Sequence, residues 1–188
     1  MRIAVEVDVF SLAQAGMARY LRNMLSNMMT ISPESEFVLY APRPVDISLP
    51  NGNWRLRTGS GLRSTVSSYW VQTECARWLA EDRIDVFWGQ NHMLPLKLRR
   101  RCRRLLTIHD LTGVLLPWTM PWNSRLMSQL YFRKAARAAD FVIADSEATA
   151  CLTHRYLGVE LARLRVVYPG VEEELHTIPF GEASCRVA

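Results

Sequence analysis

Four short apolar runs alternate along this chain with segments in which apolar residues recur at helical spacing. The runs are IDVF (84–87), LLTI (105–108), FVIA (141–144) and LRVV (164–167). Uninterrupted apolar runs of this length are typical of strands buried on both faces of a parallel sheet. The alternation of strands and helices therefore predicts an α/β fold, a Rossmann-like parallel sheet with helices on both faces.

The rest of the chain fits the same alternation. Strands are predicted over residues 3–9, 36–40, 84–89, 105–108, 141–146 and 164–170, with a further strand starting at Trp54. Helices are predicted from about residue 17 to Ser32-Pro33, over 64–81 and 123–139, and from Ser146 to Gly158. In such a sheet, ligands bind beyond the carboxyl ends of the strands, where the strand order reverses.

Length and composition indicate a globular protein. The chain has 188 residues, of which 49% are hydrophobic and 22% charged, and no apolar run reaches the roughly 18 residues of a membrane span. Glu6 and Asp8 interrupt the apolar N-terminus, which is therefore no secretory signal, and we expect a cytoplasmic protein. The four cysteines form no CxxC pair, so free thiols are expected rather than a structural zinc site.

The densest charge is the basic run KLRRRCRR, from Lys97 to Arg104. It could contact an anionic membrane surface at the inner face of the membrane, or be a solvated loop before a strand. Nucleic acid is not expected as a partner, since no binding motif accompanies the run. Trp118 and Trp122 could add an apolar patch, although tryptophan is more often used in core packing.

The polar residues that follow the strands are the candidate site residues. His109 and Asp110 end the run LLTI, where His109 could donate a hydrogen bond, polarise an oxygen, or be a structural histidine. The other histidines, His92, His154 and His176, lack paired ligand spacing, so neither a metal nor a cofactor is expected. Gly16 precedes a helix whose start could hold a phosphate, but a lone glycine there is usually a turn.

Five segments in order carry a resemblance to a known family: GMARYLRNML (16–25), DVFWGQNHMLP (85–95), LLTIHDLTGVLLPWTMP (105–121), YFRKAARAADFVIADSEATACLTHRYLG (131–158) and LRVVYPGVEEE (164–174). Together they resemble the N-terminal, acceptor-side domain of family 4 retaining glycosyltransferases. These enzymes have the GT-B architecture, in which two Rossmann-like domains face a cleft. The resemblance covers residues 2–174.

The resemblance implies roles for several residues. His109 and Asp110 match the cleft residues near the transferred sugar, and Gly16 and Arg19 match the loop and helix start near the donor diphosphate. Ala15 stands where the family often has a second glycine. The residues implied on the acceptor side are Asn91, His92, Ser146 and Glu147.

By the same resemblance, residues 1–174 are expected to form this domain, with 175–188 as a tail where the family continues into a donor-binding domain. The implied reaction moves a sugar from a nucleotide-sugar to a glycan or lipid-linked acceptor in cell-surface polysaccharide synthesis. We expect no transfer by this chain alone, because most donor contacts of the family lie in that second domain. The alternatives are a non-catalytic acceptor-binding module, a partner of a separate C-terminal GT-B half, or an unrelated Rossmann-type nucleotide binder. The last is disfavoured because no GxGxxG fingerprint follows the first strand.

Overall fold

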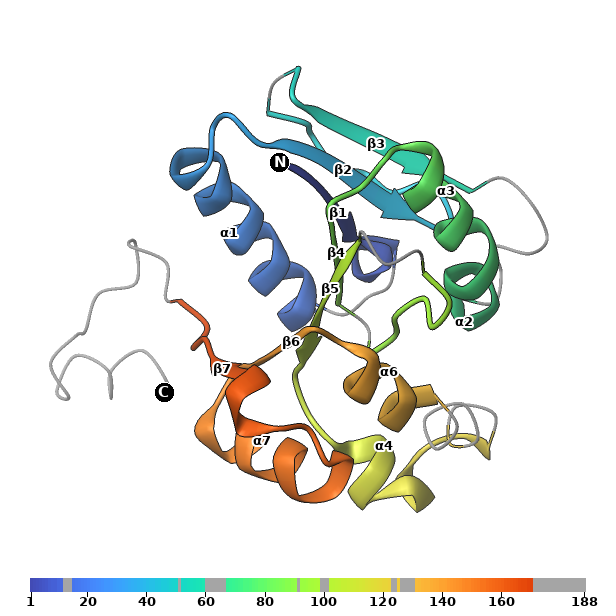
Figure 1. Ribbon diagram of the computed structural model, residues 1–188, viewed down its shortest axis with the longest axis vertical. Coiled ribbons are helices and arrows are strands. Elements are labelled where there is room, and N and C mark those ends of the chain that lie inside the picture. Colours follow the sequence, from blue (N-terminus) through green and yellow to red (C-terminus); the bar gives the residue numbers. More distant parts are fainter. Residues whose placement is uncertain are drawn as a thin grey trace, which may run out of the picture.

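A single parallel sheet organises the molecule. The computed structural model describes residues 1–11, 15–50, 52–59, 67–90, 92–98, 102–122, 125 and 131–170. Within these, seven parallel strands lie in the order β3-β2-β1-β4-β5-β6-β7 (Figure 1). They are β1 (Arg2–Glu6), β2 (Glu36–Ala41), β3 (Trp54–Thr58), β4 (Val86–Gly89), β5 (Arg103–Ile108), β6 (Phe141–Ala144) and β7 (Leu164–Val166). The predicted Rossmann-like α/β fold is confirmed.

Helices and helical turns connect the strands. The α-helices are α1 (Ala15–Ile31), α2 (Ser67–Trp70), α3 (Ala76–Glu81), α4 (Thr112–Leu115), α6 (Arg133–Ala138) and α7 (Glu147–Leu152). One π-helical turn, Val71–Cys75, joins α2 to α3, and another, Thr153–Leu157, extends α7 to Gly158. Gly158 has a φ of 70°, the left-handed conformation that ends a helix. Short 3-10 turns occupy Asp8–Ser11, Pro117–Thr119 and Leu161–Arg163.

Two hydrophobic cores lie on the two faces of the sheet. On one face, Leu21 and Leu25 of α1 pack with Val5 and Leu39 of the strands. On the other, residues of α2, α3 and α6 pack with Phe87 of β4 and its neighbours. The order of strands reverses between β1 and β4, because right-handed crossovers place α1 and the later helices on opposite faces. The reversal point is where a ligand site is expected in this fold.

Several predicted boundaries were wrong at the strand ends. The first strand stops at Glu6 rather than residue 9, because the Phe10 amide donates to the Val7 carbonyl and turns the chain. The last strand stops at Val166 rather than residue 170. The described part of the helix predicted over 123–139 is α6 with the two residues before it, since 123, 124 and 126–130 lie outside the described residues.

Two further features concern the segment that follows His109. The short helix α4 begins because Asp110 accepts a hydrogen bond of 2.7 Å from the Thr112 amide. Trp118 and Trp122 are exposed, although core packing was the favoured use. In the part of the chain that is described, no helix is both long and apolar enough to cross a bilayer.

Candidate functional site

A buried carboxylate ties the first loop to the loop after β4. Glu6 ends β1 with 3% of its surface exposed, and its Oε1 accepts a hydrogen bond of 2.8 Å from the Asp8 amide. Its Oε2 accepts one of 3.1 Å from the Gln90 amide, across the reversal of strand order. Sequence reasoning missed Glu6 as a site residue. A carboxylate inside an apolar strand was the available signal, because a buried charge requires partners.

Gln90, at the end of β4, is a second residue that the sequence did not single out for a role. It follows β4 and is 1% exposed. Its backbone amide donates to Glu6, but neither the nitrogen nor the oxygen of its side-chain amide has a hydrogen-bond partner among the described residues. Buried amides are normally satisfied. The Gln90 side-chain amide therefore has unused hydrogen-bonding capacity at the end of β4.

His109 follows β5 and occupies the middle of the predicted rim. Its Nδ1 lies 3.6 Å from Oδ2 of Asp145, and the ring of Tyr20 meets it edge-on with centroids 5.1 Å apart. Burial lowers the pKa of His109, and the nearby Asp145 charge offsets this only in part. Its Nε2 is buried without a partner in the described part of the chain. His109 is thus a neutral imidazole at pH 7, with one ring nitrogen available to a ligand.

Asp145 is held in place from the helix that follows it. The Thr149 hydroxyl donates to Oδ1 of Asp145 over 3.0 Å. Ser146 is the N-cap of α7, and its Oγ accepts a hydrogen bond of 3.1 Å from the Thr149 amide. Because the Ser146 side chain is used for capping, its contribution at the rim is to orient Asp145 and hence His109.

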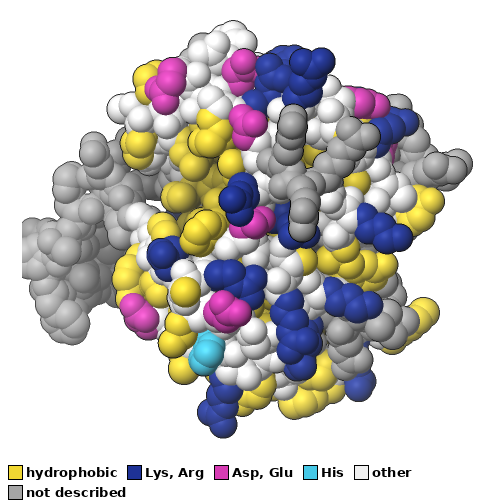
Figure 2. All heavy atoms as spheres, viewed as in Figure 1, with side chains coloured by type: hydrophobic (Ala, Val, Ile, Leu, Met, Phe, Trp, Pro, Cys, Tyr) yellow, Lys and Arg dark blue, Asp and Glu magenta, His cyan; other side chains and the backbone are white. Residues whose placement is uncertain are grey.

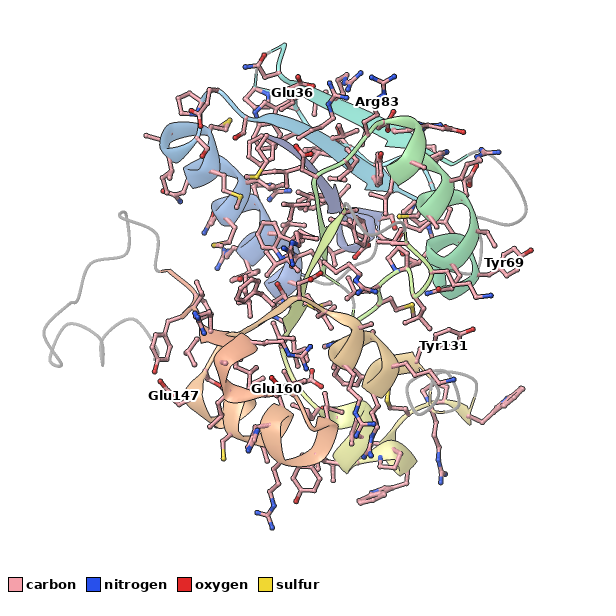
Figure 3. The ribbon with its side chains drawn as sticks, viewed as in Figure 1. Glu36, Tyr69, Arg83, Tyr131, Glu147 and Glu160 are labelled. Carbon is pink, nitrogen blue, oxygen red and sulfur yellow. The ribbon has the colours of Figure 1, made fainter. Side chains whose placement is uncertain are left out.

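Glu147, the other residue of the predicted Ser-Glu pair, points away from the core. It is exposed in the first turn of α7, where a carboxylate is favourable to the helix dipole (Figure 3). The structure brings Ser146 to the Asp145–His109 pair but leaves Glu147 facing solvent.

His92 reaches His109 from the loop after β4. The two rings are 6.4 Å apart, and the His92 ring lies 4.7 Å from that of Phe132. Burial lowers the pKa of His92 to about 4. Its φ of 56° is unusual for a residue with a side chain. Asn91, the neighbouring acceptor-side candidate, lies outside the described residues.

Asp110 is hydrogen-bonded within its own loop and lies close enough to His92 and His109 to interact with them electrostatically. Burial raises its pKa, but the hydrogen bonds with Thr112 and the nearby histidines outweigh this, so the net pKa is lower than usual. Asp110 is therefore ionised and already engaged at the start of α4, where it shapes the loop after His109.

Gly16 and Arg19 lie in the first turns of α1, and both are exposed. A Cβ placed on Gly16 would meet nothing within 4 Å, so the described structure itself does not require a glycine there. Tyr20, which follows Arg19 in α1, is buried and its ring contacts that of His109. Burial raises the pKa of the Tyr20 hydroxyl. The start of α1 and the end of β5 are therefore adjacent.

The described residues of the basic run lie at or near the amino end of β5, opposite the strand end that carries His109, and Arg103 and Arg104 are the first residues of β5. Arg103 and Arg104 both pair with Asp140, at 3.1 and 3.7 Å. Lys97 is exposed, and residues 99–101 lie outside the described residues. Among the residues described, no three His, Cys, Asp or Glu side chains are grouped so that they could hold a metal ion.

Comparison with known proteins places this geometry in a family. The model for Glycosyltransferase Family 4 matches residues 5–175. No curated protein sequence matches the chain. Similar solved structures include the wall teichoic acid polymerase TagF, at a TM-score of 0.55 and 12% identity over 89% of this chain and 38% of that one.

Two further similar structures are also glycosyltransferases. One is a glycosyltransferase from Rickettsia africae ESF-5, with a TM-score of 0.53 and 11% identity over 98% of this chain and 48% of that one. The other is an alpha-glucosyltransferase in complex with UDP and a 13-mer DNA containing an HMU base, with a TM-score of 0.52 and 11% identity over 91% and 43%. At these identities the likeness shows the fold. The chain spans less than half the length of each of these proteins.

Proposed function

Since this chain belongs to glycosyltransferase family 4, we propose that it is the acceptor-side domain of a retaining enzyme. That enzyme moves a sugar from a nucleotide-sugar to a glycan or lipid-linked acceptor. The observation that carries the proposal is the neutral His109 at the end of β5, with Nε2 unpartnered in the described structure. A neutral imidazole can form a hydrogen bond with a sugar hydroxyl. Because it carries no charge, it neither repels the nucleotide-sugar nor binds its diphosphate as an ion pair.

In this proposal His109 contacts the donor sugar, and Asp145 orients its ring through Nδ1. The sugar diphosphate approaches Gly16 and Arg19 at the start of α1, where unpaired backbone amides and the helix dipole favour an anion. The lack of any contact around a Cβ at Gly16 leaves room for that approach. Asp110 acts indirectly by fixing the loop after His109.

The acceptor approaches from the other side of His109. In the proposal, His92 and the side-chain amide of Gln90 border that approach from the end of β4, and Ser146 borders it from the start of α7, with Glu147 exposed beside it. Asn91, which the family resemblance implies for the same side, lies outside the described residues. The similar structures support a role in polymer synthesis, since one is named a wall teichoic acid polymerase, and a nucleotide donor, since another is described in complex with UDP. We place the reaction in cell-surface polysaccharide synthesis, in the cytoplasm at the inner face of the membrane.

Residues 1–188 alone are not expected to transfer sugar. The described rim offers Arg19 as a cation near the start of α1, whereas a leaving diphosphate needs several charges and donors. In the proposal a second, donor-binding GT-B domain supplies them, either in the same protein or as a separate chain that meets residues 1–174. Incubating residues 1–188 with nucleotide-sugars and an acceptor panel checks this, and clear turnover would overturn it.

The site assignment has a direct test in NMR of histidine side chains labelled with ¹⁵N, in a His176→Gln background. We expect nucleotide-sugars and oligosaccharides to shift the His109 and His92 signals. His154 is the internal control, because it is exposed on the π-helical turn after α7 and its Nδ1 contacts the Val159 carbonyl. Equal shifts at all three residues would refute the site. Shifts with oligosaccharides alone would instead identify a non-catalytic acceptor-binding module.

A further inference from the structure

The segment that follows α4 presents large apolar side chains to solvent. Leu116, Trp118 and Trp122 are 45%, 69% and 80% exposed. The backbone beneath them is ordered, because the Thr119 amide donates to the Leu116 carbonyl over 3.0 Å within the 3-10 turn Pro117–Thr119. Two tryptophans exposed within five residues depart from the usual burial of large aromatic side chains and mark an interaction surface.

The stretch of sequence that contains this segment is basic, and Asp110 and Asp140 flank it. Residues 111–139 contain Arg125, Arg133, Lys134 and Arg137, and no Asp or Glu. In the described structure none of these four forms an ion pair with a carboxylate. Arg133 and Arg137 donate instead to the backbone carbonyls of Tyr156 and Leu157, so their charges are not neutralised. The whole stretch therefore carries a net positive charge of four.

The exposed tryptophans and these charges belong to one region of the molecule. Val114 and Leu115 of α4 pack against the hydrophobic core that contains Phe132, next to Arg133 and Lys134. Figure 1 shows α4 and α6 as neighbours at one end of the molecule, and Figure 2 shows hydrophobic and basic side chains interspersed over that end. Tyr69 of α2, 48% exposed, and Tyr131 project to the same side in Figure 3.

We propose that residues 116–122, with Arg125, Arg133 and Lys134, form a surface that docks on an anionic lipid bilayer. Indole rings favour the boundary between headgroups and acyl chains, because one part of the ring is apolar and the N–H is polar. Lys and Arg beside them are attracted to anionic headgroups. The inference is independent of the proposed sugar transfer and needs no donor or acceptor.

The structure favours this surface over the basic run from Lys97 to Arg104. Arg103 and Arg104 of that run share the carboxylate of Asp140. Arg103 and Arg104 begin β5 and so lie at the amino end of that strand, whereas His109 follows its carboxyl end and residues 116–122 come after His109. A bilayer on the aromatic surface would therefore lie on the same side of the sheet as the candidate site.

A glycan is the competing occupant of exposed tryptophans. Sugar recognition requires hydrogen-bonding groups around a stacking ring, since a site that binds hydroxyls must pair them. In residues 111–122 there is no carboxylate, and the Thr119 hydroxyl already donates to the Leu116 carbonyl. Aliphatic Leu116 beside the rings suits acyl chains better than hydroxyls.

Vesicle sedimentation of the 188-residue chain tests the proposal. We expect binding to vesicles made of roughly 70% phosphatidylcholine and 30% phosphatidylglycerol, because phosphatidylglycerol supplies the anionic headgroups. Binding should weaken strongly with added salt and on neutral vesicles. The double variant Trp118→Ser/Trp122→Ser should lose about tenfold or more in partitioning. Arg125→Glu/Lys134→Glu should lose the preference for anionic vesicles.

Matched controls locate the surface. Tyr168→Ser removes an aromatic residue that is 64% exposed after β7, and Lys97→Glu reverses a charge in the other basic run; both should bind vesicles as the unchanged chain does. Near-UV circular dichroism verifies that each variant is folded. Loss of binding with Lys97→Glu but not with the tryptophan variant would overturn the proposal. So would the absence of vesicle binding together with tryptophan quenching by soluble oligosaccharides.

Discussion

Nδ1 of His109 lies 3.6 Å from the Asp145 carboxylate, joining the end of β5 to the end of β6 beside the start of α1. The same carboxylate accepts from the Thr149 hydroxyl, and Ser146 fixes Thr149 in turn. The ring that the proposed function depends on is therefore positioned by the helix that follows the next strand, not by its own loop alone.

This pair predicts a graded change in the titration of His109. Burial holds its pKa below the usual value of 6.5, and Asp145 opposes that effect. Asp145→Asn removes the opposing charge, so the pKa of His109 should fall further. NMR titration of the imidazole measures this, with the exposed Glu160→Gln as the control that leaves the pKa unchanged. A rise in pKa in Asp145→Asn would contradict the assignment.

His92 predicts a pH dependence of stability. Its pKa in the folded protein is about 4, against 6.5 in the unfolded chain. Between these values the unfolded chain binds a proton that the folded protein does not, so stability is complete above about pH 6.5 and decreases as the pH falls toward 4. The loss attributable to this residue by pH 4 is about 3 kcal/mol, since each pKa unit corresponds to about 1.4 kcal/mol.

Urea unfolding at several pH values checks this expectation. His92→Gln should flatten the decline between pH 6.5 and 4, whereas His154→Gln, at an exposed position, should keep it. An identical slope in His92→Gln and the unchanged chain would show that another group is responsible.

Gly89 and Gly16 predict opposite outcomes for the same substitution. A Cβ on Gly89 would lie 2.5 Å from the Met93 carbonyl oxygen, so Gly89→Ala must displace the loop that carries His92. We expect a cost of about 2 kcal/mol or more, within the range of overpacking. Gly16→Ala meets nothing and should be neutral or stabilise α1 by up to about 1 kcal/mol. Thermal unfolding of the two variants side by side decides it, and similar melting temperatures would contradict the contact at Gly89.

Ser146→Ala should weaken the start of α7. The Thr149 amide would lose its acceptor, at a cost of about 1 kcal/mol. Ser146→Asp keeps an acceptor and should restore most of that stability, while Ser48→Ala, on an exposed loop, should change little. Chemical denaturation measures the three, and a larger loss in Ser146→Asp than in Ser146→Ala would argue against capping.

Tyr40 and Asp82 predict a stabilising contact far from the rim. The buried Tyr40 hydroxyl donates to Asp82 over 2.5 Å, and Arg57 also pairs with that carboxylate. Tyr40→Phe removes a hydrogen bond to a charged group and should cost about 1–2 kcal/mol. Tyr69→Phe, on an exposed ring, is the control that should cost nothing measurable. Equal stability of both variants would show that Tyr40 contributes through its ring alone.

The apolar runs predicted the strands because burial on both faces leaves a local signal. The run LLTI correctly predicted that His109 directly follows the carboxyl end of a strand inside the sheet. Boundaries such as the end of β1 were missed because a single hydrogen bond, from Phe10 to Val7, decided them. Such a bond leaves no trace in composition.

The unpredicted parts of the site depend on contacts distant in sequence. Glu6 accepts from Gln90, 84 positions away, and Asp145 approaches His109 only once β5 and β6 are paired. The exposure of Trp118 depends on what the folded chain leaves uncovered, whereas its residue type favours burial. Residue type and periodicity therefore identified the rim, and the three-dimensional pairing identified which side chains work together there.

The carboxylate of Glu6 receives the amides of both Asp8 and Gln90. One side chain thus anchors two loops that belong to different strands and lead to different sides of the rim. We expect a substitution of Glu6 to disturb both loops together, because each backbone amide would lose the same acceptor.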